Sequence, residues 1–256
     1  MQINKPIVGL TGGIASGKST VASFFRLMGD CDVVSSDEVS REVMQPGHPC
    51  YLAVVAEFGT GILGKADPNN PKALRPIDRK LLRNLVFGNT PKKNAAREKL
   101  EKITHPFIRQ REQELFAQST KDYILWDVPL LIEKGLWRDC NEVIVVQADR
   151  QTQILRALER DPSANLKVIV DILNTQASNE QRAKYADFII LNNENVTKTE
   201  LISKVAKING YIMDGTVKRF RKNQQDLVMK GRALEAQRRA DEEFENLYSE
   251  ITTKKS

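Results

Sequence analysis

Short runs of apolar residues recur along the chain and are separated by stretches with apolar residues at helical spacing. The runs cover residues 7–10, 31–35, 123–126, 142–146 and 188–191. Runs this short are typical of strands buried on both faces, because helices need more residues. Strands that alternate with helices favour an α/β fold, a parallel sheet flanked by helices on both faces.

A long and mostly helical insertion is expected between the second and third strands, over residues 38–120. Asp78 is a candidate N-cap for a helix with apolar residues at positions 81, 82, 85 and 86, which we expect to end near Gly88. Further helix is expected through residues 100–116. Residues 64–76 contain three prolines and are expected to form a loop.

Helices are also expected before the second strand and after the fourth. Apolar residues from Val21 to Met28 lie at helical spacing, and Gly29 is expected to end that helix. Residues 151–160 and 166–176 are expected to form two helices joined by Asp161-Pro162-Ser163. The tail from Val217 is charged and prone to helix, and it contains too few heptads to predict a coiled coil.

Composition narrows the class of protein. The chain has 256 residues, of which 41% are hydrophobic and 28% charged, values that exclude wholesale disorder. No window approaches an apolar membrane span, and the N-terminus is not that of a signal peptide. The three cysteines lie far apart and indicate reduced residues of a cytoplasmic protein, and two histidines are too few for most His-based metal sites.

The formal net charge is +6, and it leaves several classes of partner open. Nucleic acid, an anionic membrane surface and acidic small molecules would each suit a basic protein. Residues 217–256 contain ten Lys and Arg against seven Asp and Glu, so half of the excess lies in the tail. No aromatic-rich basic stretch resembles an RNA-reading surface.

A complete phosphate-binding motif follows the first strand. Gly12, Gly17, Lys18 and Ser19 fit the P-loop pattern GxxxxGK[ST], and the predicted strand before it and helix after it supply the required context. In such a loop the backbone N–H groups surround phosphate oxygens, the lysine reaches the β- and γ-phosphates and the serine hydroxyl ligates Mg²⁺. The alternative is a glycine-rich turn with an exposed lysine. The candidate nucleotide-binding residues of the loop are Gly12, Gly13, Ile14, Ala15, Ser16, Gly17, Lys18, Ser19 and Thr20.

Two aspartates follow predicted strands and are candidates for the chemistry. Asp37 comes after the second strand, where a carboxylate can accept a proton from an acceptor hydroxyl, or instead cap the helix that begins there. Asp127 comes after the third strand, where it can support Mg²⁺ through a bound water or serve as a turn residue before Pro129.

Arginines on a later helix and one histidine complete the set of candidates. Arg156 and Arg160 are four residues apart and share one helix face, so they either close over a nucleotide or lie in solvent beside Glu159 or Asp161. His105 lies on the insertion, where a structural role is the alternative. The chain has no guanine-reading NKxD segment and no transporter-type LSGGQ signature. Asp37 after the second strand and the arginine pair on a later helix instead suit phosphoryl transfer to a small acceptor.

These residues resemble the dephospho-CoA kinase family, whose members phosphorylate the ribose 3′-hydroxyl of dephospho-coenzyme A with ATP. The resemblance covers about residues 5–208. It rests on the P-loop, Asp37 and, further along the chain, on Gln45-Pro46-Gly47, Phe58-Gly59, His105-Pro106, Asp127-Val128-Pro129-Leu130-Leu131-Ile132-Glu133, Gln153, Arg156, Arg160-Asp161, Gln176 and Ala186-Asp187 leading to Asn192.

The resemblance implies a nucleoside-kinase-like P-loop fold in several parts. Residues 1–37, 121–150 and 183–210 would form the nucleotide-binding core, 38–120 the acceptor-binding insertion, 151–182 a lid and 211–256 a charged helical extension without an assigned role. ATP and dephospho-CoA are the implied substrates, with Mg²⁺ as the cofactor. We expect no nucleic-acid or membrane partner, and we expect a monomer, with an oligomer as the alternative.

The resemblance also implies roles for individual residues. Asp37 would be the base, Lys18 and Arg156 would act on the transferring phosphoryl group, and Ser19 would hold Mg²⁺ with Asp127 behind it. Arg160 and Asn192 would bind the nucleotide. The implied acceptor-binding residues are Thr11, Asp37, His105, Arg109, Pro129 and Leu130.

Two positions depart from the pattern of the family. Ala15 stands where the family often has glycine, which is tolerable if φ at this residue is negative. Ser35 replaces the first acid of an Asp-x-Asp pair. Two other functions stay open at this point, namely a P-loop kinase for another small molecule, such as a nucleoside monophosphate, and a nucleic-acid-binding NTPase.

Overall fold

The structure is a computed structural model that describes residues 5–70, 72–86, 88, 90–162, 164–222 and 235. The predicted strands are present and form one sheet, so the predicted α/β class is confirmed. The strands are β1 (Ile7–Gly12), β2 (Cys31–Ser35), β3 (Tyr123–Asp127), β4 (Glu142–Gln147) and β5 (Phe188–Leu191).

The order of the strands places the candidate residues at one edge of the sheet. The order is β2-β3-β1-β4-β5, and all neighbouring strands are parallel. Asp127 pairs in register with Ser35 of β2 on one side and with Leu10 of β1 on the other. Because parallel strands bring their carboxyl ends to the same edge, the loops after β1, β2 and β3 meet there, and ligands of such sheets bind at this edge.

Helices connect the strands and cover the sheet. They are α1 (Lys18–Met28), α2 (Ser36–Val43), α3 (Pro49–Phe58), α4 (Arg79–Val86), α5 (Pro91–Gln118), α6 (Arg150–Arg160), α7 (Leu166–Thr175), α8 (Asn179–Ala183) and α9 (Lys198–Tyr211). The carboxylate of Asp78 accepts the N–H groups of Lys80 and Leu81 at 2.8 and 3.1 Å, so the predicted cap of α4 is confirmed.

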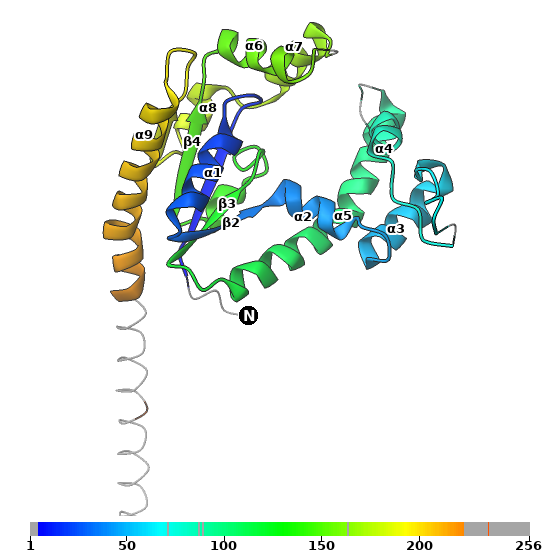
Figure 1. The fold of residues 1–256 in the computed structure, drawn as a ribbon, viewed down its shortest axis with the longest axis horizontal. Helices are drawn as coiled ribbons and strands as arrows, with labels where there is room; N and C mark the ends of the chain where they lie inside the picture. The colour runs from blue at the N-terminus through cyan, green and yellow to red at the C-terminus, as the bar shows by residue number, and fades with distance from the viewer. Residues whose placement is uncertain are drawn as a thin grey trace, which may run out of the picture. The chain divides into compact units, whose positions relative to one another are not determined.

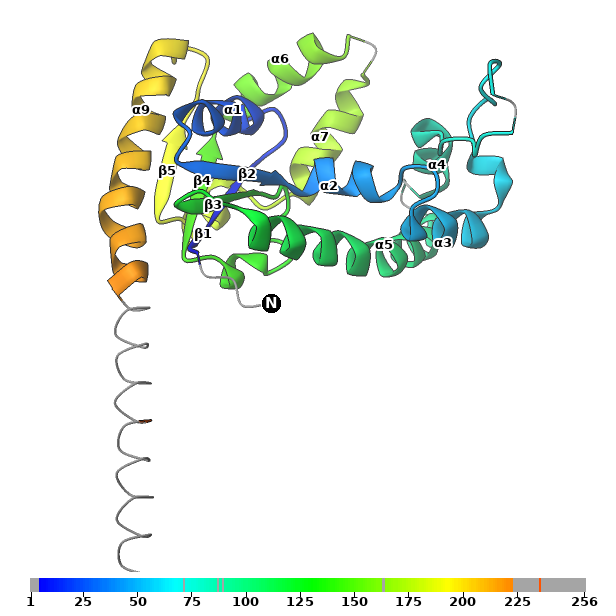
Figure 2. The same cartoon turned by 60° about the horizontal axis from the view of Figure 1, so that its bottom comes forward.

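The helices α2 to α5 lie beside the carboxyl end of β2 and extend away from the sheet, as Figures 1 and 2 both show. The helix α5 is the common support of this group, because α2, α3 and α4 all contact it. Pro106 lies inside α5 and has no N–H to donate to the carbonyl of Lys102, which weakens the helix at that point.

The helices α6 and α7 form a second group, near the end of the sheet at which β1 leads into α1 (Figure 2). They contact each other and correspond to residues 151–160 and 166–176 of the sequence prediction, and Ser163 of their predicted connection lies outside the described residues.

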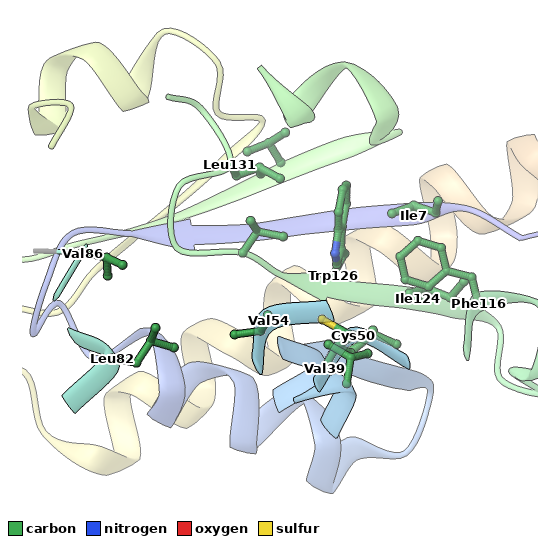
Figure 3. Packing of buried hydrophobic residues seen from close by; sticks show 14 of the residues in the cluster. Ile7, Val39, Cys50, Val54, Leu82, Val86, Phe116, Ile124, Trp126 and Leu131 are labelled. Atoms are coloured by element: carbon green, nitrogen blue, oxygen red, sulfur yellow. The ribbon is translucent and has the colours of Figure 1, made fainter. Parts of the chain in front are cut away.

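The hydrophobic core joins the sheet to the insertion. Trp126 and Ile124 of β3 are fully buried, and Phe116 of α5 meets the Trp126 ring edge-on with the ring centres 5.7 Å apart. Figure 3 shows these side chains together with apolar residues of α2, α3 and α4 in the same cluster. The insertion is therefore packed on the sheet through a continuous apolar layer.

The chain divides after Asn209 into two compact units, and the first contains the sheet and both helical groups. In the second unit a π-helical segment covers Ile212–Val217. Beyond residue 222 only Glu235 is described, so most of the extension predicted for 211–256 lies outside the described residues. Within the described residues, none of the helices has the length and apolar character needed to cross a bilayer.

Candidate active site

The P-loop connects β1 to α1, as the sequence predicts. Gly12 ends β1, and α1 begins at Lys18. The loop closes on itself through the N–H of Ser16, which donates to the carbonyl of Gly13 at 3.1 Å. Helix α1 begins directly after this loop, so its free N–H groups and the helix dipole favour a phosphate at the loop.

Ala15 adopts a left-handed backbone conformation. Its φ is +54°, whereas alanine was expected to be tolerated here only with a negative φ. An L-residue in the left-handed region costs about 1–2 kcal/mol. Ala15 is the one non-glycine with positive φ among the described residues, and the strain lies within the phosphate-binding loop.

Three side chains hold the loop around Ala15 from outside. The N–H of Ile14 donates to Oε1 of Gln176 at 2.9 Å, and Nε2 of Gln153 donates to the carbonyl of Ile14 at 2.7 Å. Nδ2 of Asn192 donates to the carbonyl of Ser16 at 2.8 Å. The strained residue is therefore fixed on both sides by hydrogen bonds from α6, from the residue after α7 and from the residue after β5.

The side chain of Asn192 lies so close to Gly17 that only glycine fits at this position. Asn192 is buried, and a Cβ added to Gly17 would lie 2.1 Å from its Nδ2 atom. Gly17 also has φ of +89°, which glycine adopts without strain. The second glycine of the motif therefore serves both the turn and the close approach of Asn192.

Lys18 forms an ion pair with Asp127 at the carboxyl end of β3. Asp127 is buried, and burial raises the pKa of its carboxyl above the ordinary value of 3.8, while Lys18 acts in the opposite direction. Asp127 is a strand residue, so the alternative of a turn residue is wrong. The carboxylate of Asp37 contributes to the raised pKa of Asp127, which puts both acids and Lys18 in one electrostatic environment.

Asp37 is exposed at the second position of α2. The alternative that Asp37 caps α2 is wrong, because the hydroxyl of Ser35 accepts the N–H of Glu38 at 3.4 Å and is the cap. Ser35 thus replaces the missing aspartate of the Asp-x-Asp pair with a capping role. The Asp37 carboxylate is left open to a ligand at the edge of the sheet.

The two arginines of α6 have different surroundings. Nη1 of Arg156 donates to the carbonyl of Asn192 at 2.7 Å and lies 4.0 Å from the position of a Cβ on Gly17. Arg156 is therefore beside the P-loop, and the solvated alternative is wrong for it. Arg160 is exposed at the end of α6.

The residues predicted to bind the acceptor fall into two groups. Thr11 and Pro129 are neighbours at the sheet edge, since the Thr11 hydroxyl donates to the Pro129 carbonyl at 3.1 Å, and Leu130 follows with 37% of its surface exposed. His105 and Arg109 lie on α5. His105 is exposed and 3.9 Å from Glu101, and Arg109 pairs with Asp139 at 2.7 Å and lies over the ring of Trp126.

A hollow in the insertion, which the sequence did not indicate, has a volume of about 240 Å³. The residues that line it come from α2, from the loop after α2, from the segment that precedes α4 and from α4 itself. Two are arginines and most of the others are apolar: Arg41, Met44, Gln45, Pro46, Pro76, Ile77, Arg79 and Leu82.

A buried ion pair, which the sequence did not indicate as part of the site, joins the loop after β3 to α8. Arg182 is 2% exposed, and its Nη2 atom donates to Glu133 at 3.0 Å, while Glu133 also accepts the N–H of Ala177 at 2.9 Å. The same guanidinium lies against the P-loop, 3.2 Å from where a Cβ of Gly13 would be. Sequence spacing could not reveal this pair, because 49 residues separate its members.

The donor set suits a magnesium ion that arrives with a nucleotide. In the described residues, no cluster of three or more His, Cys, Asp or Glu side chains could hold a metal by itself. Ser19 is exposed at the start of α1. The Asp127 carboxylate forms an ion pair with Lys18, the residue that precedes Ser19. Mg²⁺ is commonly held by one or two protein oxygens and the phosphates of a substrate, and these residues fit that pattern.

A family model and sequence relatives of this chain point to the same protein family. The family model described as dephospho-CoA kinase matches residues 6–198. The dephospho-CoA kinase of Escherichia coli K12 is 36% identical over 207 residues, which is 81% of this chain and 93% of the relative.

Two solved structures agree with the sequence comparison. A dephospho-CoA kinase from Campylobacter jejuni has a TM-score of 0.54 and 25% identity over 82% of this chain and 98% of its own. A Thermus thermophilus protein is similar in fold, with a TM-score of 0.66 and 23% identity over 80% of this chain and 95% of that structure.

Proposed function

This chain belongs to the dephospho-CoA kinase family, and from that premise we propose how its residues carry out the ATP-dependent phosphorylation of dephospho-coenzyme A. The reaction transfers the γ-phosphoryl group of ATP to the ribose 3′-hydroxyl and forms coenzyme A and ADP, the last step of coenzyme A synthesis. The observation that carries the assignment of roles is the meeting of the P-loop, Lys18, Asp127 and the exposed Asp37 at one sheet edge.

ATP binds with its phosphates in the P-loop. The N–H groups at the start of α1 face the phosphate oxygens, and Lys18, which the ion pair with Asp127 holds at the sheet edge, reaches the β- and γ-phosphates. Gln153, Gln176 and Asn192 fix the loop before the nucleotide arrives. Less reorganisation is then needed when ATP binds.

Asp37 is the catalytic base. Its exposed carboxylate accepts the proton of the ribose 3′-hydroxyl while the oxygen attacks the γ-phosphorus and the bond to the β-phosphate oxygen of ADP breaks. Arg156, beside the P-loop, neutralises the charge that develops on the transferring group. Arg160 and Asn192 complete the nucleotide site.

Ser19 and Asp127 would hold Mg²⁺ together with the phosphates. When bound, the ion neutralises charge on the β- and γ-phosphates and orients them for in-line attack. Ser19 would provide its exposed hydroxyl, and the buried Asp127 would support the ion with its carboxylate.

Dephospho-CoA binds between the sheet edge and the insertion. Thr11, Pro129 and Leu130 lie at the edge, and His105 and Arg109 lie on α5. The hollow lined by Arg41 and Arg79 suits a ligand with both an uncharged arm and phosphates, which dephospho-CoA has. The lid of α6 and α7 excludes water from the reacting groups.

The family match disfavours the two other functions that the sequence left open. A kinase for nucleoside monophosphates would transfer phosphate to a monophosphate. A nucleic-acid-binding NTPase would hydrolyse ATP faster in the presence of RNA or DNA. The monomeric state and the cytoplasmic location stay predictions.

Release of ADP tests the function. Purified protein with ATP and Mg²⁺ is offered dephospho-CoA, AMP, CMP and single-stranded RNA in separate reactions. We expect only dephospho-CoA to stimulate ADP release. Equal or greater stimulation by a monophosphate or by RNA would contradict the assignment.

A further inference from the structure

A carboxylate is buried where the insertion meets the sheet. Glu112 of α5 is 3% exposed, and its Oε1 atom accepts two hydrogen bonds. One comes from the hydroxyl of Ser36 at 2.5 Å and the other from Nε1 of Trp126 at 2.9 Å. No motif in the sequence points to this residue, and the mechanism above does not use it.

The two donors occupy related positions in the chain. Ser36 immediately precedes Asp37, the proposed base, and Trp126 immediately precedes Asp127, the partner of Lys18. The two segments are neighbours in the sheet, because Ser35 and Asp127 pair in register. The Oε1 atom of Glu112 therefore links Ser36 and Trp126, and each of these two residues directly precedes an acid of the site.

The same face of α5 holds the Trp126 ring in other ways. Arg109, three residues before Glu112, lies over the ring with its guanidinium carbon 5.1 Å from the ring centre. Phe116, four residues after Glu112, meets the ring edge-on. Figure 3 shows Trp126 and Phe116 side by side in the core. The position of Trp126 is thus fixed by one helix that belongs to the insertion.

Stability alone is a poor explanation for this arrangement. A buried carboxylate must be desolvated, and two neutral donors return only part of that cost. An apolar side chain of similar size would pack in the same layer, which is otherwise hydrophobic. A positioning role explains why the site retains a carboxylate.

We propose that Glu112 is a positioning residue of the phosphoryl transfer, which holds Ser36 and Trp126 so that Asp37 and Asp127 face the substrates. The proposal rests on the proposed function. Glu112 does not touch the reacting atoms, so its loss should lower kcat through displacement of the base. The affinity for ATP, which depends on the P-loop, should change little.

The test compares Glu112→Leu, Ser36→Ala and the double variant with the wild type. The kcat with dephospho-CoA is expressed per ATP-binding site measured by calorimetry, so that misfolded protein does not count. We expect Glu112→Leu to lower kcat by about 10- to 100-fold, since small misplacements of reacting groups have effects of this size. The Kd for ATP should stay within about twofold.

The double variant tests whether Glu112 acts through Ser36. Ser36→Ala should lower kcat by about 3- to 10-fold, the effect of one lost hydrogen bond. Adding it to Glu112→Leu should lower kcat no further, because the bond is already absent. Glu114→Leu is the matched control, since Glu114 lies two residues along α5 and pairs with Arg111 at the surface, and it should retain the wild-type kcat.

Unchanged kcat per site in Glu112→Leu, or two effects that multiply in the double variant, would overturn the proposal. If Glu112→Leu does not fold, Ser36→Ala decides alone, and a wild-type kcat there overturns it. The wild type in the same assay separates the two claims, because its failure to use dephospho-CoA would overturn the proposed function instead.

Discussion

Lys18 at the start of α1 and Asp127 at the end of β3 form an ion pair although 109 residues separate them in the sequence. The pair keeps the lysine at the sheet edge. A phosphate that binds in the P-loop therefore meets a lysine whose charge is already in position. Such advance positioning lowers the reorganisation that catalysis needs.

Replacing Lys18 should alter the dependence of stability on pH. The folded-state pKa of Asp127 is raised, so the folded chain holds this proton more tightly than the unfolded chain does. The contribution of Asp127 to the free energy of unfolding is therefore greatest below the ordinary pKa, falls as the pH rises through the folded-state value, and is constant above it. Lys18→Met removes the attraction that lowers this pKa, so the fall should extend to higher pH.

Urea unfolding between about pH 4 and pH 8 measures this effect. When Asp127→Asn is already present, adding Lys18→Met should no longer change the pH dependence of stability. Lys92→Met serves as a control, because Lys92 is exposed on α5. Identical pH profiles of Lys18→Met and wild type would show that the ion pair does not control the carboxyl.

Ala15 and Gly17 should respond in opposite ways to exchange of their residue types. Ala15→Gly relieves an alanine with φ of +54° and should raise the free energy of unfolding by about 1 kcal/mol, with kinase activity retained. Gly17→Ala places a Cβ 2.1 Å from Asn192 at φ of +89° and should lower both stability and ATP affinity. Thermal unfolding measured by calorimetry, with and without ATP, gives the stability and the ATP stabilisation of both variants. Equal stability of Ala15→Gly and wild type would contradict the strain in the loop.

Gln153 should affect nucleotide binding only through its hydrogen bond to the backbone of the P-loop. Gln153→Leu keeps the size of the side chain and removes the donor to the Ile14 carbonyl, so the loop is less well fixed. We expect the Kd for ATP to rise about 5- to 10-fold, the value of one hydrogen bond at a buried site. Gln151→Leu, an exposed neighbour on α6, is the matched control. Equal Kd values for the two variants, measured by calorimetry, would disprove the role of Gln153.

Asp37→Asn should separate chemistry from binding. The amide keeps the shape of the side chain and cannot accept the hydroxyl proton, so kcat should fall by about 10²- to 10⁴-fold. The Kd for ATP should stay close to that of the wild type. Glu38→Gln, the exposed neighbour on α2, should keep its activity. A kcat of Asp37→Asn within a few-fold of the wild type would mean that another group accepts the proton.

The strands and the P-loop could be predicted from the sequence because their signals are local. The five apolar runs and the spacing of Gly12, Gly17 and Lys18 are properties of short segments. The cap of α4 at Asp78 was predictable for the same reason. Helix α9 was not predicted, although Leu201, Val205 and Ile208, which it buries, stand at helical spacing in the sequence.

The contacts of the supporting residues could not be predicted, because they join residues that are far apart in the sequence. Gln153 and Gln176 reach Ile14 across 139 and 162 residues, and Glu112 reaches Ser36 across 76. Nothing near these residues in the sequence indicates their partners. The cap of α2 shows the opposite difficulty, since Ser35 and Asp37 are both good capping residues and only the backbone geometry selects Ser35.

The chemical structure of the product decides whether this protein phosphorylates the ribose 3′-hydroxyl of dephospho-CoA. Purified protein is incubated with ATP, Mg²⁺ and dephospho-CoA, and the product is examined by mass spectrometry and by proton-phosphorus correlation NMR. We expect the addition of one phosphate and a new monoester phosphorus that correlates with the ribose H3′ proton. A phosphate on any other atom, or ATP hydrolysis with dephospho-CoA unchanged, would contradict it.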